Sequence, residues 1–100
     1  MSEWIDFIHP PRDDFAATMT DEEKDVWSVH FMRSQRLLAE GMFILVGPTL
    51  GPPNSGIAIF EALNKAAAQR FMEEGSIIAG GFARGELQPF RVSLLRGRDD

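Results

Sequence analysis

The sequence predicts one α+β domain in which four strands alternate with two helices. Residues 42–46 and 56–60 carry no polar or charged side chain, which indicates strands that are covered on both faces. Each of two helical segments has a capping residue at its start and a glycine at its end. The chain has 100 residues, of which 44% are hydrophobic, and this is enough for one core. No linker interrupts it, so we expect a single domain over residues 1–100.

The first half of the chain reads as a strand, a loop and a long helix. Residues 4–9 are rich in aromatic and β-branched side chains and stop at two prolines, which end a strand. The helix predicted over residues 21–40 begins at a capping box formed by Thr20 and Glu23. Gly41 ends it, because glycine readily adopts the left-handed conformation that closes helices.

The second half reads as two strands, a helix and a last strand. The strands cover residues 42–48 and 56–62, and the helix between Asn64 and Gly75 is followed by a strand over 86–95. The complete order is βαββαβ, the split βαβ or ferredoxin-like arrangement. Right-handed crossovers then place both helices on one face of a four-stranded antiparallel sheet.

Two polar side chains occur on otherwise apolar faces. Asp6 shares a strand face with Trp4 and Ile8, and we interpret it as lying at an exposed edge or as partly buried with a satisfied carboxylate. On a helical wheel, the predicted buried arc contains Trp27, Phe31, Ser34 and Leu38. His30 lies at the border of this arc. His30 is therefore either a packed histidine with one hydrogen-bond partner or a site residue.

Composition and motifs exclude several classes of function. The net charge of -5 argues against nucleic acid or an anionic membrane as a partner. Without cysteine there is no disulfide or thiolate site, and two histidines, His9 and His30, do not make a multi-histidine metal site. No phosphate-binding motif is present, so we predict neither metal nor cofactor. The start lacks the pattern of a signal peptide, and no apolar run could span a membrane, so we expect a cytoplasmic protein.

A series of short motifs resembles the YCII-related (YciI-like) family along nearly the whole chain. In chain order these are Pro10-Pro11-Arg12, a capped helix with His30, Gly41, Val46-Gly47-Pro48, Gly56 before a strand, and Pro89-Phe90. The resemblance implies a single YCII-like domain with the fold of the dimeric α+β barrel superfamily. It also implies that His30 matches a helix histidine that the family pairs with an aspartate for proton transfer on a small molecule. The position of that aspartate, in the loop after the Gly-Pro corner, is Gly51 in this chain.

Two functions follow from this resemblance. The first is binding of a small anionic or aromatic ligand by a degenerate member of the family that lacks the loop aspartate. The ligand would then lie beside His30, in contact with Arg12, Pro48 and Gly51. The alternative is a small lyase or isomerase with His30 as general base. A carboxylate that reaches His30 from elsewhere in the chain, such as Asp6 or Glu61, would favour catalysis.

Arg12 can be interpreted in two ways. It could hold an anionic group of the ligand through paired hydrogen bonds. The alternative is a surface arginine that pairs with Asp13 or Asp14.

The predicted sheet has one uncovered face. Two helices cover only one side of a four-stranded sheet, yet the strands over residues 42–46 and 56–60 are apolar on both. Such a large apolar surface is unusual on a monomer. We therefore expect a homodimer in which the open faces of two sheets pack together.

Overall fold

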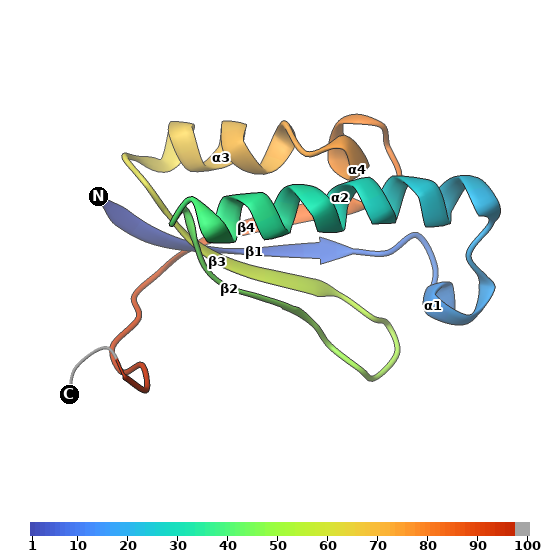
Figure 1. Cartoon of the computed structure of the whole chain (residues 1–100), viewed down its shortest axis with the longest axis horizontal. Coiled ribbons are helices and arrows are strands. Elements are labelled where there is room, and N and C mark those ends of the chain that lie inside the picture. Colours follow the sequence, from blue (N-terminus) through green and yellow to red (C-terminus); the bar gives the residue numbers. More distant parts are fainter. Residues whose placement is uncertain (98–100) are drawn as a thin grey trace.

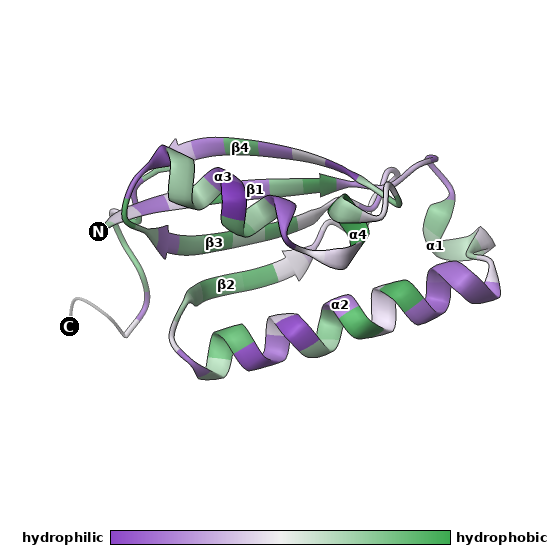
Figure 2. Cartoon of the chain, turned by 90° about the horizontal axis from the view of Figure 1, so that it is seen from above, coloured by the Kyte–Doolittle hydropathy of each residue, from purple (hydrophilic) through white to green (hydrophobic). Residues whose placement is uncertain are grey.

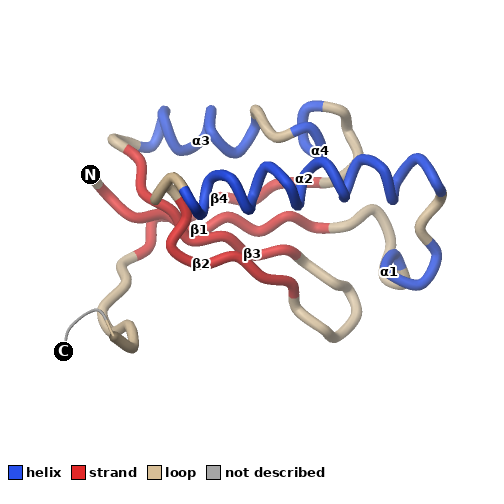
Figure 3. The backbone as a smooth tube through the Cα atoms, in the orientation of Figure 1, coloured by secondary structure: helices blue, strands red, loops and turns tan. Residues whose placement is uncertain are grey.

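The computed structural model describes residues 1–97 and contains one antiparallel sheet with helices on one of its faces (Figure 1). The strands are β1 (Ser2–His9), β2 (Phe43–Pro48), β3 (Gly56–Ala62) and β4 (Arg84–Phe90). Two longer helices, α2 (Asp21–Ala39) and α3 (Lys65–Glu73), are accompanied by two single turns, α1 (Phe15–Thr18) and α4 (Ser76–Ala79). Figure 3 shows α2, α3 and α4 in one layer and the strands in the other, with α1 beyond the end of the sheet.

The order of strands in the sheet is β2-β3-β1-β4, and every neighbouring pair is antiparallel. This is the ferredoxin-like order that the sequence predicts. In the register, Trp4 lies opposite Phe60 and Asp6 lies opposite Ala58, so these four side chains share the face toward the helices. The opposite face, which we call the open face, carries Ile5 and its neighbours.

The helix boundaries follow the predicted capping chemistry. The Thr20 hydroxyl accepts from the backbone N–H of Glu23, and the Glu23 carboxylate accepts from the backbone N–H of Thr20, which completes the capping box. Gly41 follows α2 with a φ of 84°, a conformation that favours glycine. The Asn64 side chain accepts from the N–H of Ala67 and caps α3 in the same manner.

Aromatic side chains dominate the core between the sheet and α3. Phe60 is fully buried, and its ring lies 4.9 Å from that of Phe71 and 6.2 Å from that of Phe43. A second group of buried side chains, Ile8, Met72 and Ile77, fills the space under α4. Trp27 is only partly buried and packs against this second group and against Phe15, with ring centroids 4.6 Å apart.

The inward face of α2 differs from the predicted arc. Phe31 and Leu38 are exposed by 59% and 51%, whereas Leu37 is buried, so the prediction of a buried Phe31 and Leu38 was wrong. The real inward side is centred on His30, Ser34 and Leu37. Because polar side chains on this side line a cavity, the most apolar arc of the wheel is not the buried one. Figure 2 shows α2 running alongside β2 at the border of the sheet.

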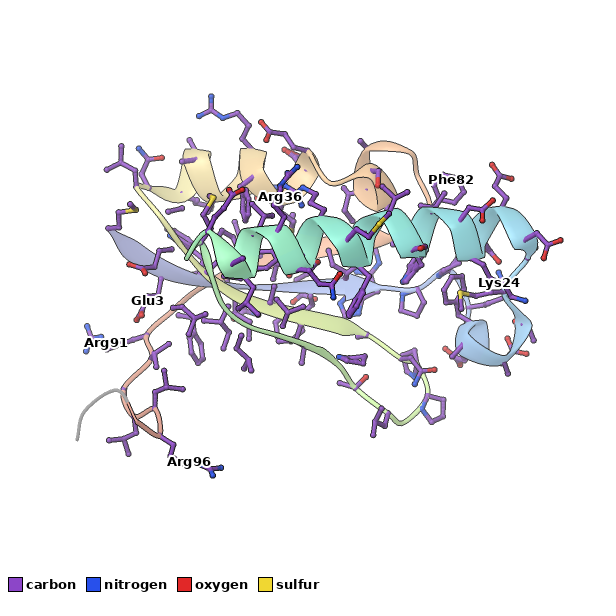
Figure 4. All side chains as sticks on the ribbon, viewed as in Figure 1. Glu3, Lys24, Arg36, Phe82, Arg91 and Arg96 are labelled. Atoms are coloured by element: carbon purple, nitrogen blue, oxygen red, sulfur yellow. The ribbon has the colours of Figure 1, made fainter. Side chains whose placement is uncertain are left out.

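The end of the chain also departs from the prediction. The last strand stops at Phe90 and does not continue to residue 95. Val92 leaves the sheet and donates its N–H to Glu3 Oε1 at 2.9 Å. Arg91 and Arg96 project from this segment away from the body of the molecule (Figure 4). Within residues 1–97, no helix has the length and apolar character needed to cross a bilayer.

Candidate functional site

A cavity of about 360 Å³ lies between α2, the sheet and the hairpin that joins β2 to β3. Most of its lining is aromatic or aliphatic, and the polar exceptions come mainly from β1 and α2. The aromatic lining consists of Phe15, Trp27, Phe31, Phe43 and Phe71, and the polar side chains are Asp6, His30, Arg33, Ser34 and Asn54. A mostly apolar cavity with a few converging polar groups is the usual form of a small-molecule site.

His30 reaches this cavity because α2 presents one helical face to it. Residues 30, 33, 34 and 37 are spaced by three and four positions, so they lie on the same side of the helix. The Nδ1 atom of His30 is buried and has no hydrogen-bond partner among residues 1–97. Burial, and secondarily the charge of Arg33, lowers the pKa of His30 below its ordinary value of 6.5. The imidazole is therefore neutral at pH 7 and can accept a proton.

Asp6 faces the same cavity from β1. It is 5% exposed, and its Oδ1 atom has no hydrogen-bond partner in the part of the chain that the structure describes. Both interpretations of Asp6 were wrong: β1 is an inner strand with β3 and β4 on its two sides, and the carboxylate is buried with one oxygen unsatisfied within residues 1–97. Burial raises the pKa of Asp6 from 3.8 to about 7, against smaller opposing effects of the Ala58 backbone and of Arg33. Asp6 thus exchanges its proton near neutral pH.

Ser34 is not available as a nucleophile in this site. Its hydroxyl donates to the backbone carbonyl of His30 at 3.0 Å, one turn back along α2. The polar chemistry of the cavity therefore rests on the carboxyl group, the imidazole and the guanidinium of Arg33.

The four residues predicted for the site lie in different places. His30 and Pro48 line the cavity, whereas Arg12 and Gly51 are not among its lining residues. Gly51 lies in the exposed turn of the β2–β3 hairpin, where a Cβ atom would meet nothing within 4 Å.

Arg12 is held away from the cavity by other groups. Its guanidinium donates to both carboxylate oxygens of Glu23, at 2.7 and 3.0 Å, and to the carbonyl of Thr18 at 2.6 Å. It also lies over the ring of Phe15 at 5.0 Å. With its donors directed to these partners, Arg12 braces the turn that carries Phe15 into the cavity wall.

Sequence reasoning missed Arg33 as a site residue, and it named Asp6 only as a carboxylate that could reach His30. Both gave a signal, since Asp6 alternates with Trp4 and Ile8 on a strongly apolar strand face. Arg33 follows His30 by three positions, which places the two on the same helical face.

A second polar cluster lies on the open face of the sheet. His9 Nε2 lies 3.1 Å from Glu86 Oε1, and His9 Nδ1 lies 2.9 Å from the hydroxyl of Ser55. A carboxylate only accepts, so Nε2 carries the proton of the neutral imidazole, and in that tautomer Nδ1 accepts from Ser55. The hydrogen bond from His9 lowers the pKa of Glu86. This cluster connects the base of the β2–β3 hairpin to β4 across the end of β1.

Neither cluster has the composition of a metal site. Across residues 1–97, no three histidine or acidic side chains gather closely enough to hold an ion.

Comparison with known proteins leaves the fold and the cavity as the basis for classification. No protein-family model matches this chain, and no curated protein matches it either. The fold defines an α+β protein of ferredoxin-like topology, and the site defines a largely apolar cavity with an acid, an imidazole and a guanidinium on its walls.

Proposed function

We propose that this chain is a small-molecule-binding protein of the YCII-like type and that its ligand occupies the cavity beside His30. The supporting observation is that two of the three buried side-chain polar atoms without partners within residues 1–97, Asp6 Oδ1 and His30 Nδ1, belong to residues that line one cavity. Buried polar atoms in folded proteins nearly always have a hydrogen-bond partner, and a ligand would supply both. Within this type the chain is a member without the loop aspartate, because Gly51 occupies that position.

A second candidate is a small lyase or isomerase in which His30 is the general base. The observation that favours it is the presence of Asp6 on the same cavity, with a pKa of about 7. A neutral imidazole could take a proton from a carbon beside a carbonyl group, while the protonated carboxyl group gives one to another atom of the same molecule. This pair would replace the family's pair of histidine and loop aspartate.

One NMR experiment tests both candidates, with cyclohexanone as a neutral probe in D₂O. If the cavity binds small molecules, millimolar cyclohexanone should shift the signals of His30, Ala58 and other lining residues. If the protein is also an isomerase, deuterium should replace the protons beside the carbonyl faster than in buffer. This exchange should be lost in His30→Ala.

His9→Ala is the matched control, since His9 is the other histidine of the chain and lies on the open face. Exchange at equal rates in both variants would rule out His30 as the base. Binding without exchange would leave the protein a binder, and unchanged cavity signals with cyclohexanone, benzamide and benzoate alike would refute the binding proposal.

We propose further that two copies form a homodimer through the open faces of their sheets. The proposal is supported by the apolar side chains of this face, which include Ile5, Phe7, Ile57 and Leu45. Leu45 is 52% exposed in the single chain, and burying its apolar side chain against a second sheet would be favourable. The negative net charge argues against nucleic acid or an anionic membrane as a partner. We also propose that the protein is cytoplasmic.

The dimer predicts a specific response to charge at position 45. Sedimentation of the native protein at micromolar concentration should give twice the chain mass of 11.2 kDa. Leu45→Glu should give a folded monomer, because the substitution would bury two unpaired carboxylates in the interface. Leu38→Glu is the control, since Leu38 has nearly the same exposure but lies on α2, away from the open face. A native monomer, or a dimer that survives Leu45→Glu, would exclude this interface.

A further inference from the structure

The guanidinium of Arg33 is half-buried in the cavity wall and makes little use of its donors. With the residues that the structure describes it forms one hydrogen bond, from Nη2 to the carbonyl of Phe71, and this bond is long at 3.4 Å. The guanidinium also stacks over the ring of Phe71 at 5.0 Å, and a Cβ atom at Gly75 would lie 3.4 Å from Nη1. The group is therefore fixed between an aromatic ring and a glycine, with most of its five N–H donors unused.

No carboxylate of residues 1–97 lies within 4.0 Å of Arg33. Glu74 and Asp6 act on it only at longer range, and burial lowers the pKa of the guanidinium without removing its charge. A partly desolvated cation without a counterion is unfavourable, so this position attracts an anion.

We infer that the ligand of this cavity is a monocarboxylate on a flat apolar ring and that Arg33 is the residue that recognises its carboxylate. The inference rests on the binding function proposed above and adds the class of ligand to it. A carboxylate fits the planar fork of a guanidinium with two parallel hydrogen bonds. Five aromatic side chains in the lining suit a flat ring, and the volume of about 360 Å³ suits a small one.

The charges of the cavity agree with one negative charge on the ligand. At neutral pH His30 is uncharged, and burial keeps much of Asp6 protonated. The lining then carries the positive charge of Arg33 and at most a partial negative charge on Asp6. A ligand with one negative charge would balance the remaining positive charge. The protonated Asp6 could also donate a hydrogen bond to the second side of the ligand.

Other arginines on this side of the molecule lack these features. Arg12 is engaged by Glu23, as described above. Arg36, labelled on α2 in Figure 4, pairs with Glu40 at 3.7 Å and is exposed. It lies three residues after Arg33 on the same helix, which makes it a matched control.

The test uses benzoate and benzamide, which have the same shape and differ in charge, in NMR titrations of the full chain. The native protein should bind benzoate at least about tenfold more tightly than benzamide, with both probes shifting His30 signals. Arg33→Gln should remove this preference and keep the affinity for benzamide, whereas Arg36→Gln should leave both affinities unchanged.

The outcomes separate this inference from the binding proposal. Equal affinity of the native protein for the two probes at His30 would overturn the carboxylate specificity and leave the binding function standing. A preference that survives in Arg33→Gln would overturn the role of Arg33. Absence of binding by benzoate, benzamide and cyclohexanone would overturn both proposals. The comparison of probes on the native protein remains decisive if Arg33→Gln does not fold.

Discussion

Replacing Asp6 with asparagine should remove a large fall in stability that the native protein shows between about pH 4 and pH 7. The folded-state pKa of Asp6 is raised from 3.8 to about 7 by burial. Below the pKa of the unfolded chain, the carboxyl group is neutral in the folded and the unfolded states, so its burial does not lower the free energy of unfolding. As the pH rises, the unfolded chain ionises first, so the free energy of unfolding falls until the folded protein also loses the proton. The total loss is on the order of 4 kcal/mol for a shift of this size.

Chemical denaturation at about pH 5 and about pH 8 measures this effect. The native protein should lose much of its stability between the two conditions, whereas Asp6→Asn should lose far less. Asp13→Asn is the control, because Asp13 is exposed in the loop after β1. A pH dependence that is the same in the native protein and in Asp6→Asn would show that Asp6 is not buried as a neutral group.

Two neighbouring leucines on α2 should respond very differently to truncation. Leu37 is 5% exposed and belongs to the aromatic core, whereas Leu38 is 51% exposed. Leu37→Ala should therefore lower the free energy of unfolding by about 2–5 kcal/mol, because it leaves a cavity in the core. Leu38→Ala should change it by no more than about 0.5 kcal/mol, as is usual for surface positions.

Denaturant titration of the two variants under one condition decides this prediction, and each variant is the control for the other. A larger cost for Leu38→Ala than for Leu37→Ala would mean that α2 is rotated about its axis relative to the structure. The orientation of His30 and Arg33 toward the cavity would then be wrong as well, since they share the face of Leu37.

The fold was predictable because its local signals agree with each other. The capping box at Thr20, the glycine at position 41 and the apolar strands each favour the same order of elements, and the structure confirms that order. The extent of the last strand was not predictable from local pattern. Alternation of apolar residues continues to Leu94, but pairing with β1 stops with Phe90 opposite Glu3, one residue from the first residue of β1, Ser2.

The candidate site was only partly predictable, because burial depends on which elements pack together. His30 was found through a resemblance and through its place beside the apolar arc. Asp6 was interpreted as an edge or partly buried residue, because the position of β1 inside the sheet depends on pairing with distant strands. Arg12 and Arg33 look alike in the sequence, and only tertiary contacts show that Glu23 engages the first.

The hydrogen bond between Ser55 and His9 has a consequence for communication between the two faces of the sheet. Ser55 lies at the base of the hairpin whose residues Pro48 and Asn54 form part of the cavity wall, while His9 and Glu86 lie on the open face. A second chain that covers the open face would therefore also restrict the movement of this wall. Thermodynamic linkage is reciprocal. If dimerisation increases the affinity for a ligand that fixes the hairpin, that ligand would increase the affinity between the two chains by the same factor.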